Sequence, residues 1–165
     1  MPARMRHGRN VTKNFLTTTN SRFHLGSYYT SIDRMMFIFE ESRALYPSIY
    51  LYGSSSLMTS SQQQRYVHAK ITEAYWIHHQ LGKSLPVFLF TKIEYNPYVT
   101  DPKGIEFYSQ DSVCNTLNFP ASSGVNGMIV WSTSSNMGKR CGVIAEYLTD
   151  VYGPKVKTVQ DEFQR

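Results

Sequence analysis

The chain has 165 residues, of which 41% are hydrophobic and 18% are charged, and its formal charge is +5 at pH 7. This length suits one domain with its own core, but it is too short for a complete eight-stranded α/β barrel of roughly 250 residues. Apolar runs fall short of the about 18 residues that a membrane-spanning helix needs, and two cysteines are too few for a disulfide scaffold or a zinc cluster.

The net positive charge favours polyanionic partners, either nucleic acid or acidic polysaccharide. Part of this charge lies in a basic cluster near the N-terminus, formed by Arg4, Arg6, Arg9 and Lys13. A solvated basic tail is the simpler explanation of this cluster. Because no recognisable nucleic-acid-binding module accompanies it, we expect no nucleic acid partner.

The first part of the chain predicts one helix and one strand after an irregular start. Residues 1–32 show no sustained hydrophobic period, so we expect an irregular segment there. Residues 33–45 have helical spacing, and Tyr46-Pro47 should end this helix, because the residue before a proline disfavours helical conformation. Residues 48–51 then read as a short strand.

The middle of the chain predicts two more helices around a second strand. Apolar residues recur at steps of three and four over residues 61–81, and Gly82 suits the C-terminal stop of this helix. Residues 86–90 form the second predicted strand, followed by a long loop. A third helix should begin near Ser109, a good N-cap, and extend to about residue 121.

The third predicted strand is the apolar run 128–130, which ends on Trp131. An unbroken apolar run of this kind predicts a strand that is buried on both faces, as in a parallel sheet flanked by helices. The last helix follows a Ser/Thr-rich loop, and Gly153-Pro154 should close it.

Helices and strands therefore alternate, which predicts an α/β fold with about three parallel strands and four helices. Parallel strands end at the same edge of a sheet, so Tyr50, Thr91 and Trp131 should lie on one rim. In α/β folds this rim carries the binding site. Trp131 suits a surface on which a sugar ring stacks, although a tryptophan that plugs the top of the core fits the pattern equally well.

Glu94 and Asp101 are the carboxylates that we expect near this rim. A glycosidase places a proton-donating carboxyl group beside the bond that is cut, usually with a second carboxylate nearby. Glu94 fits such an acid, but a loop carboxylate is more often simply solvated. The five histidines lack metal-ligand spacing and no nucleotide-binding motif occurs, so we expect no metal and no cofactor.

Four motifs in unbroken order resemble the C-terminal half of a hyaluronidase: residues 44–51 (ALYPSIYL), 85–88 (LPVF), 127–131 (GMIVW), and 146–148 (EYL) with Gly153-Pro154. The resemblance implies a partial TIM-like (βα) barrel over residues 33–160, with residues 161–165 as a tail. It also implies a glycosidase that hydrolyses β-1,4 N-acetylglucosaminide links in hyaluronan. Members of that family are mostly secreted or lysosomal.

The resemblance gives two residues a role. Tyr50 corresponds to the family tyrosine that borders the N-acetyl group of the substrate, and Trp131 corresponds to the tryptophan that walls the same pocket. In that family the acetamido oxygen of the substrate is the nucleophile, so a single glutamate serves as general acid and then base, steered by a nearby aspartate. We therefore expect Tyr50 and Trp131 to bind hyaluronan or a related glycosaminoglycan.

The chain also departs from the family pattern. The catalytic Asp-x-Glu pair has no counterpart, because this pattern occurs nowhere in the 165 residues. Ser132 replaces the usual glycine, Cys141 matches a cysteine whose disulfide partner lies in the other half of the family barrel, and Cys114 matches none. We therefore expect a fragment that is inactive alone and prone to self-association. The alternative is a non-catalytic protein that binds acidic glycans.

Overall fold

The computed structural model describes residues 32–54, 57–98 and 101–163. It divides the chain into two units, Met1–Ile38 and Phe39–Arg165. The predicted irregular segment lies almost wholly outside the described residues, and the predicted division into residues 1–32, 33–160 and 161–165 stays a prediction. Within the described ranges, no helix combines the length and the apolar character needed to cross a bilayer.

The first predicted helix is shorter than the sequence pattern indicates. Helix α2 is Met36–Glu41 and not residues 33–45. The prediction was wrong at its C-terminal end because Leu45 pairs in parallel with Val87, and its N–H donates to the carbonyl of Pro86 at 2.8 Å. Tertiary pairing of the backbone therefore overrides the helical spacing of the sequence.

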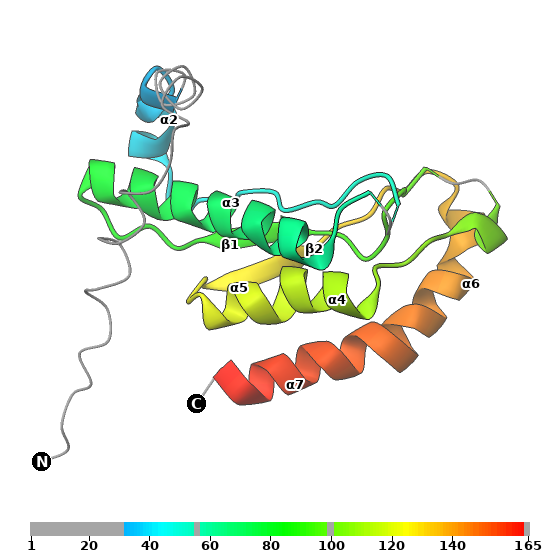
Figure 1. Cartoon of the computed structure of the whole chain (residues 1–165). Helices are drawn as coiled ribbons and strands as arrows, with labels where there is room; N and C mark the ends of the chain where they lie inside the picture. Colours follow the sequence, from blue (N-terminus) through cyan, green and yellow to red (C-terminus); the bar gives the residue numbers. More distant parts are fainter. Residues whose placement is uncertain (1–31, 55–56, 99–100, 164–165) are drawn as a thin grey trace, which may run out of the picture. The chain divides into compact units, whose positions relative to one another are not determined.

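The sheet of the 39–165 unit pairs two strands in parallel, as predicted. Strand β1 is Phe88–Thr91 and strand β2 is Gly127–Val130, with Phe88 opposite Gly127 and Thr91 opposite Val130. The two strands lie side by side in Figure 1. The mixed α/β class is confirmed, whereas the partial TIM-like barrel that the resemblance implies stays a prediction.

The predicted strand 48–51 does not form as a regular strand. The chain runs alongside β1 in parallel, but it pairs only through isolated bridges at Leu45 and Ser48. The carbonyl of Pro47 accepts a hydrogen bond from the N–H of Phe90 at 2.9 Å. Pro47 has no N–H to return to the ladder, so the pairing is interrupted at this residue.

The expectation that residues 128–130 are buried on both faces is wrong. Gly127, Met128 and Ile129 are half-buried, and Val130 is 44% exposed. The physical reason is that β2 pairs with β1 on one side only, so in the described part of the chain it is an edge strand.

Helix α3, Ser60–Leu81, is the longest element and confirms its prediction. Thr59 caps its N-terminus in a capping box with Gln62, and Gly82 ends it in the left-handed conformation at φ 60°. The apolar spacing predicts a stripe of Val67, Ile71, Ala74, His78 and Leu81, of which the first three are buried and the last two are half-buried.

Two further helical stretches complete the 39–165 unit. The first comprises α4 (Gln110–Val113), the π-helical turn η2 (Cys114–Asn118) and α5 (Phe119–Ser122), and Ser109 caps it as predicted. The second comprises α6 (Met137–Tyr147), the π-helical turn η3 (Leu148–Tyr152) and α7 (Gly153–Phe163). In Figure 1, the α4–α5 stretch lies between α3 and α7, and it contacts both.

The prediction that Gly153-Pro154 closes the last helix is wrong. The helix continues to Phe163. Pro154 has no N–H to donate within the helix, and the π-helical turn before it changes the hydrogen-bond pattern so that the helix tolerates the proline. In this turn the N–H of Gly153 reaches back to the carbonyl of Leu148. The stretch α4–α5 has the same arrangement of a π-helical turn before a proline, because η2 ends two residues before Pro120.

The loop between β1 and α4 is anchored to the interior. It contains the 3₁₀ turn η1 (Pro102–Gly104). The hydroxyls of Tyr95 and Ser112 lie 2.6 Å apart, and Ser112 donates to the side-chain oxygen of Gln63 in α3 at 2.8 Å. The Tyr108 hydroxyl accepts from the N–H of Leu51 at 2.8 Å. These residues adjoin one core cluster, whose buried members are Leu51, Ile93, Tyr95, Tyr108, Val113, Leu117, Ile144, Tyr152 and Val159.

Gly153→Ala should destabilise the chain, because the new Cβ would lie 2.6 Å from the carbonyl oxygen of Leu148. Overpacking of this kind costs about 1–3 kcal/mol of unfolding free energy. The matched control is Gly142→Ala in α6, where a Cβ meets nothing within 4 Å and should stabilise by about 0.5–1 kcal/mol. Urea denaturation measures both, and equal effects of the two substitutions would refute the role of the π-helical turn.

Candidate functional site

The two aromatic residues singled out in the sequence, Tyr50 and Trp131, lie together. The end of β1 positions both: the carbonyl of Phe90 accepts from the N–H of Ile49, and the carbonyl of Thr91 accepts from the N–H of Trp131, each at 2.9 Å. Their ring centroids are 5.8 Å apart, with an angle of 23° between the ring planes. We call these two rings the aromatic pair.

The geometry of the aromatic pair limits how a sugar can bind. A ring sandwiched between the two side chains would need two van der Waals separations of about 3.5–4.0 Å each, which exceed the 5.8 Å between the centroids. A sugar can therefore stack on the solvent-facing part of the pair, where Trp131 is 39% exposed. That Tyr50 and Trp131 bind substrate stays a prediction.

The phenol of Tyr50 is set up as a neutral hydrogen-bond donor. Burial raises the pKa of Tyr50 above its ordinary value of 10.0, while a hydrogen bond with the side chain of Ser48 partly offsets this effect. Tyr52 lies against Tyr50 edge-on, with ring centroids 6.3 Å apart, and it is 61% exposed. Three aromatic residues therefore gather at the carboxyl edge of the sheet.

A lysine lies against these rings. The ammonium nitrogen of Lys92 is 5.0 Å from the centroid of the Tyr50 ring and 4.4 Å from that of Tyr52. Lys92 follows β1 directly and is only 2% exposed. Burial lowers the pKa of Lys92, and the negative charge of Glu94 partly offsets this.

Glu94 is not a free acid at the rim. Its carboxylate is fully buried and forms an ion pair with the guanidinium of Arg140, in which one nitrogen contacts both carboxylate oxygens. Ser132 donates its hydroxyl to Glu94 at 2.5 Å, and Arg140 also donates to the carbonyl of Ser135 at 3.1 Å. The sequence allowed two interpretations of Glu94, a solvated loop carboxylate or a proton donor. The buried ion pair fits neither of them.

The other candidate residues have structural explanations. Asp101 is exposed, and its carboxylate accepts a hydrogen bond from the N–H of Lys103 at 3.0 Å, which caps η1. Cys114 and Cys141 are both exposed and free. Among the described residues, no group of three or more His, Cys, Asp or Glu side chains is placed to hold a metal ion.

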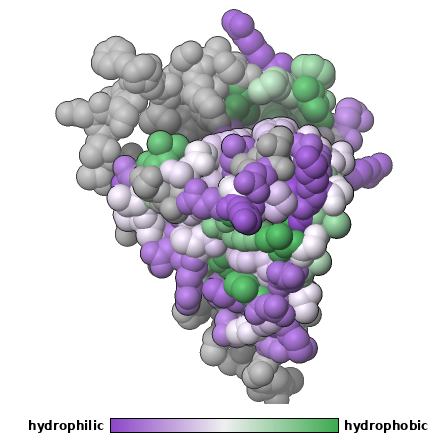
Figure 2. Space-filling view, turned by 90° about the vertical axis from the view of Figure 1, so that its right-hand side faces the viewer, coloured by the Kyte–Doolittle hydropathy of each residue, from purple (hydrophilic) through white to green (hydrophobic). Residues whose placement is uncertain are grey.

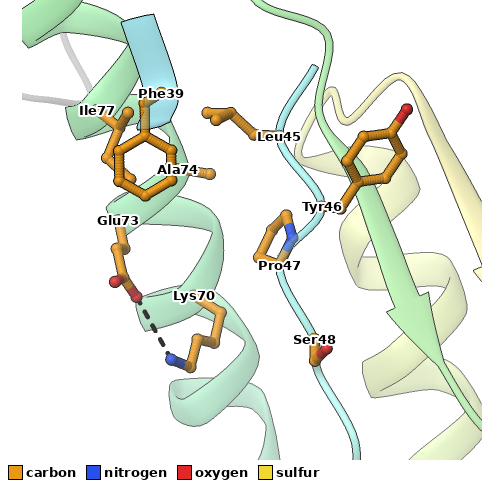
Figure 3. Close-up of a pocket in the computed structure, with 9 residues that line it drawn as sticks. All are labelled: Phe39, Leu45, Tyr46, Pro47, Ser48, Lys70, Glu73, Ala74 and Ile77. Atoms are coloured by element: carbon orange, nitrogen blue, oxygen red, sulfur yellow. Dashed lines mark hydrogen bonds and ion pairs between the residues drawn. The ribbon is translucent and has the colours of Figure 1, made fainter. Parts of the chain in front are cut away.

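A cavity of about 210 Å³ lies between α3 and the chain around Pro47 (Figure 3). Its lining combines apolar side chains with the ion pair between Lys70 and Glu73, whose charged atoms are 3.4 Å apart. Neither Tyr50 nor Trp131 lines it. Ser48 lines the cavity and forms a side-chain hydrogen bond with Tyr50, so the cavity adjoins the candidate site without including the aromatic pair.

The surface on the side where α6 begins is mixed in character. Figure 2 shows hydrophilic residues over most of the coloured part of this face, with small hydrophobic groups between them.

Sequence reasoning missed the buried charges behind the aromatic pair. Residues 91–95 read Thr-Lys-Ile-Glu-Tyr, and Ile93 and Tyr95 pack in the core cluster. This alternation signals an extended chain, and Glu94 indeed forms an antiparallel bridge with Phe107. That Lys92 and Glu94 are both buried could not be read from the alternation, because their partners come from distant parts of the chain.

Glu94→Gln should destabilise the chain by about 3–5 kcal/mol, because it leaves the buried charge of Arg140 without its partner. The double variant with Arg140→Met should be more stable than Glu94→Gln alone. An exposed ion pair gives the control: Lys157→Ala, which removes the partner of Asp161, should cost at most ~1 kcal/mol. Thermal and urea denaturation measure these differences. A Glu94→Gln variant as stable as Lys157→Ala would contradict the structural role of Glu94.

Comparisons with known proteins agree with this geometry. A solved structure of bee venom hyaluronidase in complex with a hyaluronic acid tetramer superposes with a TM-score of 0.67 and 26% sequence identity, covering 81% of this chain and 40% of that one. The chain is 37% identical over 124 residues to a chondroitin hydrolase of Caenorhabditis elegans. This alignment covers 74% of the chain and 26% of the relative. It is 31% identical over 131 residues to mouse hyaluronidase-5, in an alignment that covers 77% of the chain and 24% of that relative.

The chain thus spans about a quarter of the length of these two relatives. The family model described as hyaluronidase matches residues 27–164, which is most of the chain. The resemblance seen in the sequence motifs is confirmed, and the chain belongs to the hyaluronidase family.

Proposed function

We propose that this chain supplies the sugar-binding aromatic surface of a hyaluronidase-family glycoside hydrolase that acts on a glycosaminoglycan. The contact between Tyr50 and Trp131 at the carboxyl edge of the sheet carries this proposal. Binding sites in α/β folds lie at this edge, and an exposed indole face beside a phenol offers stacking and hydrogen bonding together.

The chemistry of the pair suits an N-acetylhexosamine. A tyrosine hydroxyl is protonated at neutral pH even at its ordinary pKa of 10.0, and burial raises the pKa of Tyr50 further, so this hydroxyl can donate a hydrogen bond to an acetamido oxygen. The indole of Trp131 offers the apolar face of the sugar a stacking partner. Holding the acetamido group in one orientation favours its attack within the substrate, which is a proximity effect of potentially several orders of magnitude.

The acid that such a reaction requires is not offered by this site. Asp-x-Glu occurs nowhere in the 165 residues, and Glu94 is buried in its ion pair with Arg140. We therefore expect the isolated chain to bind glycan without cleaving it, because loss of a general acid lowers the rate by about 10²–10⁴-fold. Hydrolysis would need a further polypeptide segment to place a carboxyl group beside the aromatic pair.

The names of the relatives support one class of substrate for this proposal. One is named for chondroitin and others for hyaluronan, and both polymers alternate N-acetylhexosamine with uronic acid. We propose this class for the present chain, in a partial TIM-like barrel to which β1, β2 and the bridged segment 45–51 contribute neighbouring stretches of backbone. The parallel pairing and the structural likeness to the bee venom enzyme support this placement. A secreted or lysosomal location is proposed with the family.

Trp131→Ala should weaken binding of a hyaluronan oligosaccharide about tenfold, because loss of a stacked aromatic ring costs roughly 1–3 kcal/mol. Isothermal titration calorimetry of the full chain measures the Kd. Phe163→Ala is the control, since Phe163 is an exposed aromatic residue (47%) at the end of α7. An unchanged Kd for Trp131→Ala would refute the proposed surface, and release of reducing sugar ends by the wild-type chain would refute the expected lack of cleavage.

A further inference from the structure

The ammonium group of Lys92 lacks the partner that a buried cation normally has. Its contacts in the described part of the chain are the faces of Tyr50 and Tyr52, and no hydrogen bond of its nitrogen is found there. An ammonium carries three N–H donors, and cation–π contacts satisfy them only in part. Lys92 is 2% exposed as a whole residue, and its nitrogen is not among the fully buried polar atoms without a hydrogen-bond partner in the described part of the chain, so the small exposed area includes the ammonium. A cation with so little access to water is costly unless an anion compensates its charge.

The nearby negative charge does not supply this compensation. Glu94 attracts the ammonium and partly restores its pKa, but its carboxylate oxygens contact Arg140 and Ser132. Lys92, Glu94 and Arg140 are all at most 2% exposed, so two cations share one anion beneath the aromatic pair. One positive charge therefore remains unbalanced at the place where the proposed substrate would stack.

We propose that the Lys92 ammonium recognises the carboxylate of a uronic acid in a glycosaminoglycan held on the aromatic pair. This inference rests on the proposed function, and it assigns recognition of the negative charge of the substrate to Lys92. A sugar stacked on Trp131 brings its neighbour in the polymer close to Tyr50 and Tyr52, the rings that cover Lys92. A carboxylate there would complete the hydrogen bonds of the ammonium and neutralise the excess charge.

Tyr52 is the exposed ring beside the ammonium. This side chain is 61% exposed, and its ring is the nearer of the two to the Lys92 nitrogen, at 4.4 Å. An exposed tyrosine changes its χ1 rotamer on a timescale far shorter than that of binding, so it can move aside for a carboxylate. Tyr50, in contrast, is half-buried and stacked on Trp131.

The test compares acidic and neutral oligosaccharides that share N-acetylglucosamine. Calorimetry of the full chain at fixed ionic strength would measure the Kd for a hyaluronan oligosaccharide and for a chitin oligosaccharide of equal length. Lys92→Met should weaken hyaluronan binding about tenfold or more, which is the weight of a charge-assisted hydrogen bond. The same variant should leave chitin-oligosaccharide binding within about twofold, and Lys92→Arg should retain most of the affinity for hyaluronan.

Two controls separate this role from other effects. Lys157→Met removes one charge from an exposed side chain of α7 and should leave both Kd values unchanged within about twofold. Carboxyl-reduced hyaluronan, titrated into the wild-type chain, should bind as weakly as intact hyaluronan binds to Lys92→Met. This second measurement needs no substitution, so it tests the proposal even if Lys92→Met does not fold.

Each outcome decides between defined alternatives. Equal weakening of acidic and neutral ligands by Lys92→Met would show that Lys92 only supports the tyrosine rings, and it would overturn the inference. Unchanged hyaluronan binding by this variant, or wild-type binding of carboxyl-reduced hyaluronan as tight as that of intact hyaluronan, would overturn it while leaving the proposed function standing. Absence of hyaluronan binding to the wild-type chain would overturn both.

Discussion

Two backbone hydrogen bonds at the end of β1 determine where the site lies. The carbonyl of Phe90 holds the chain at Ile49, and the carbonyl of Thr91 holds it at Trp131, each at 2.9 Å. Because both neighbours run parallel to β1, Tyr50 and Trp131 emerge at the same edge although they are far apart in the sequence. The stacked aromatic pair is a direct consequence of this register.

The charged residues behind the pair give the site its chemical character. The ion pair between Glu94 and Arg140 joins the chain after β1 to α6, and Ser132 after β2 completes it. A buried pair of this kind adds little net stability, but it is costly to break, so it fixes one arrangement of these segments. The Glu94 carboxylate, which the sequence suggested as a catalytic acid, is therefore held in this ion pair. The Lys92 ammonium is left without an anionic partner of its own.

The sequence predicted those features that depend on local rules. The C-terminal stop of α3 follows from Gly82 and the N-cap of α4 from Ser109, and the parallel order follows from the alternation of helices and strands. The meeting of Tyr50 with Trp131 follows from that order, although their role in binding stays a prediction. Predictions that rested on a single local signal were wrong in two places. At Leu45, parallel pairing with Val87 replaces the predicted end of the first helix. At Pro154, a π-helical turn lets the last helix continue.

Other features could not be predicted because they depend on contacts between distant residues. The burial of Lys92 and Glu94 requires Tyr52 and Arg140, which no local pattern connects with them. The half-buried state of β2 reflects the lack of a second neighbour within the described residues. Self-association through this edge, which the sequence suggested, stays a prediction.

The central claim is that the aromatic pair is the surface that meets the glycan. The chain has two tryptophans, Trp131 in the pair and Trp76 in α3, so its two indole N–H signals in a ¹⁵N-correlated NMR spectrum provide a site probe and an internal control. On titration with a hyaluronan tetrasaccharide, the account predicts a saturable shift of the Trp131 signal and an unchanged Trp76 signal. A Trp131 signal that does not move while the oligosaccharide binds elsewhere would contradict it.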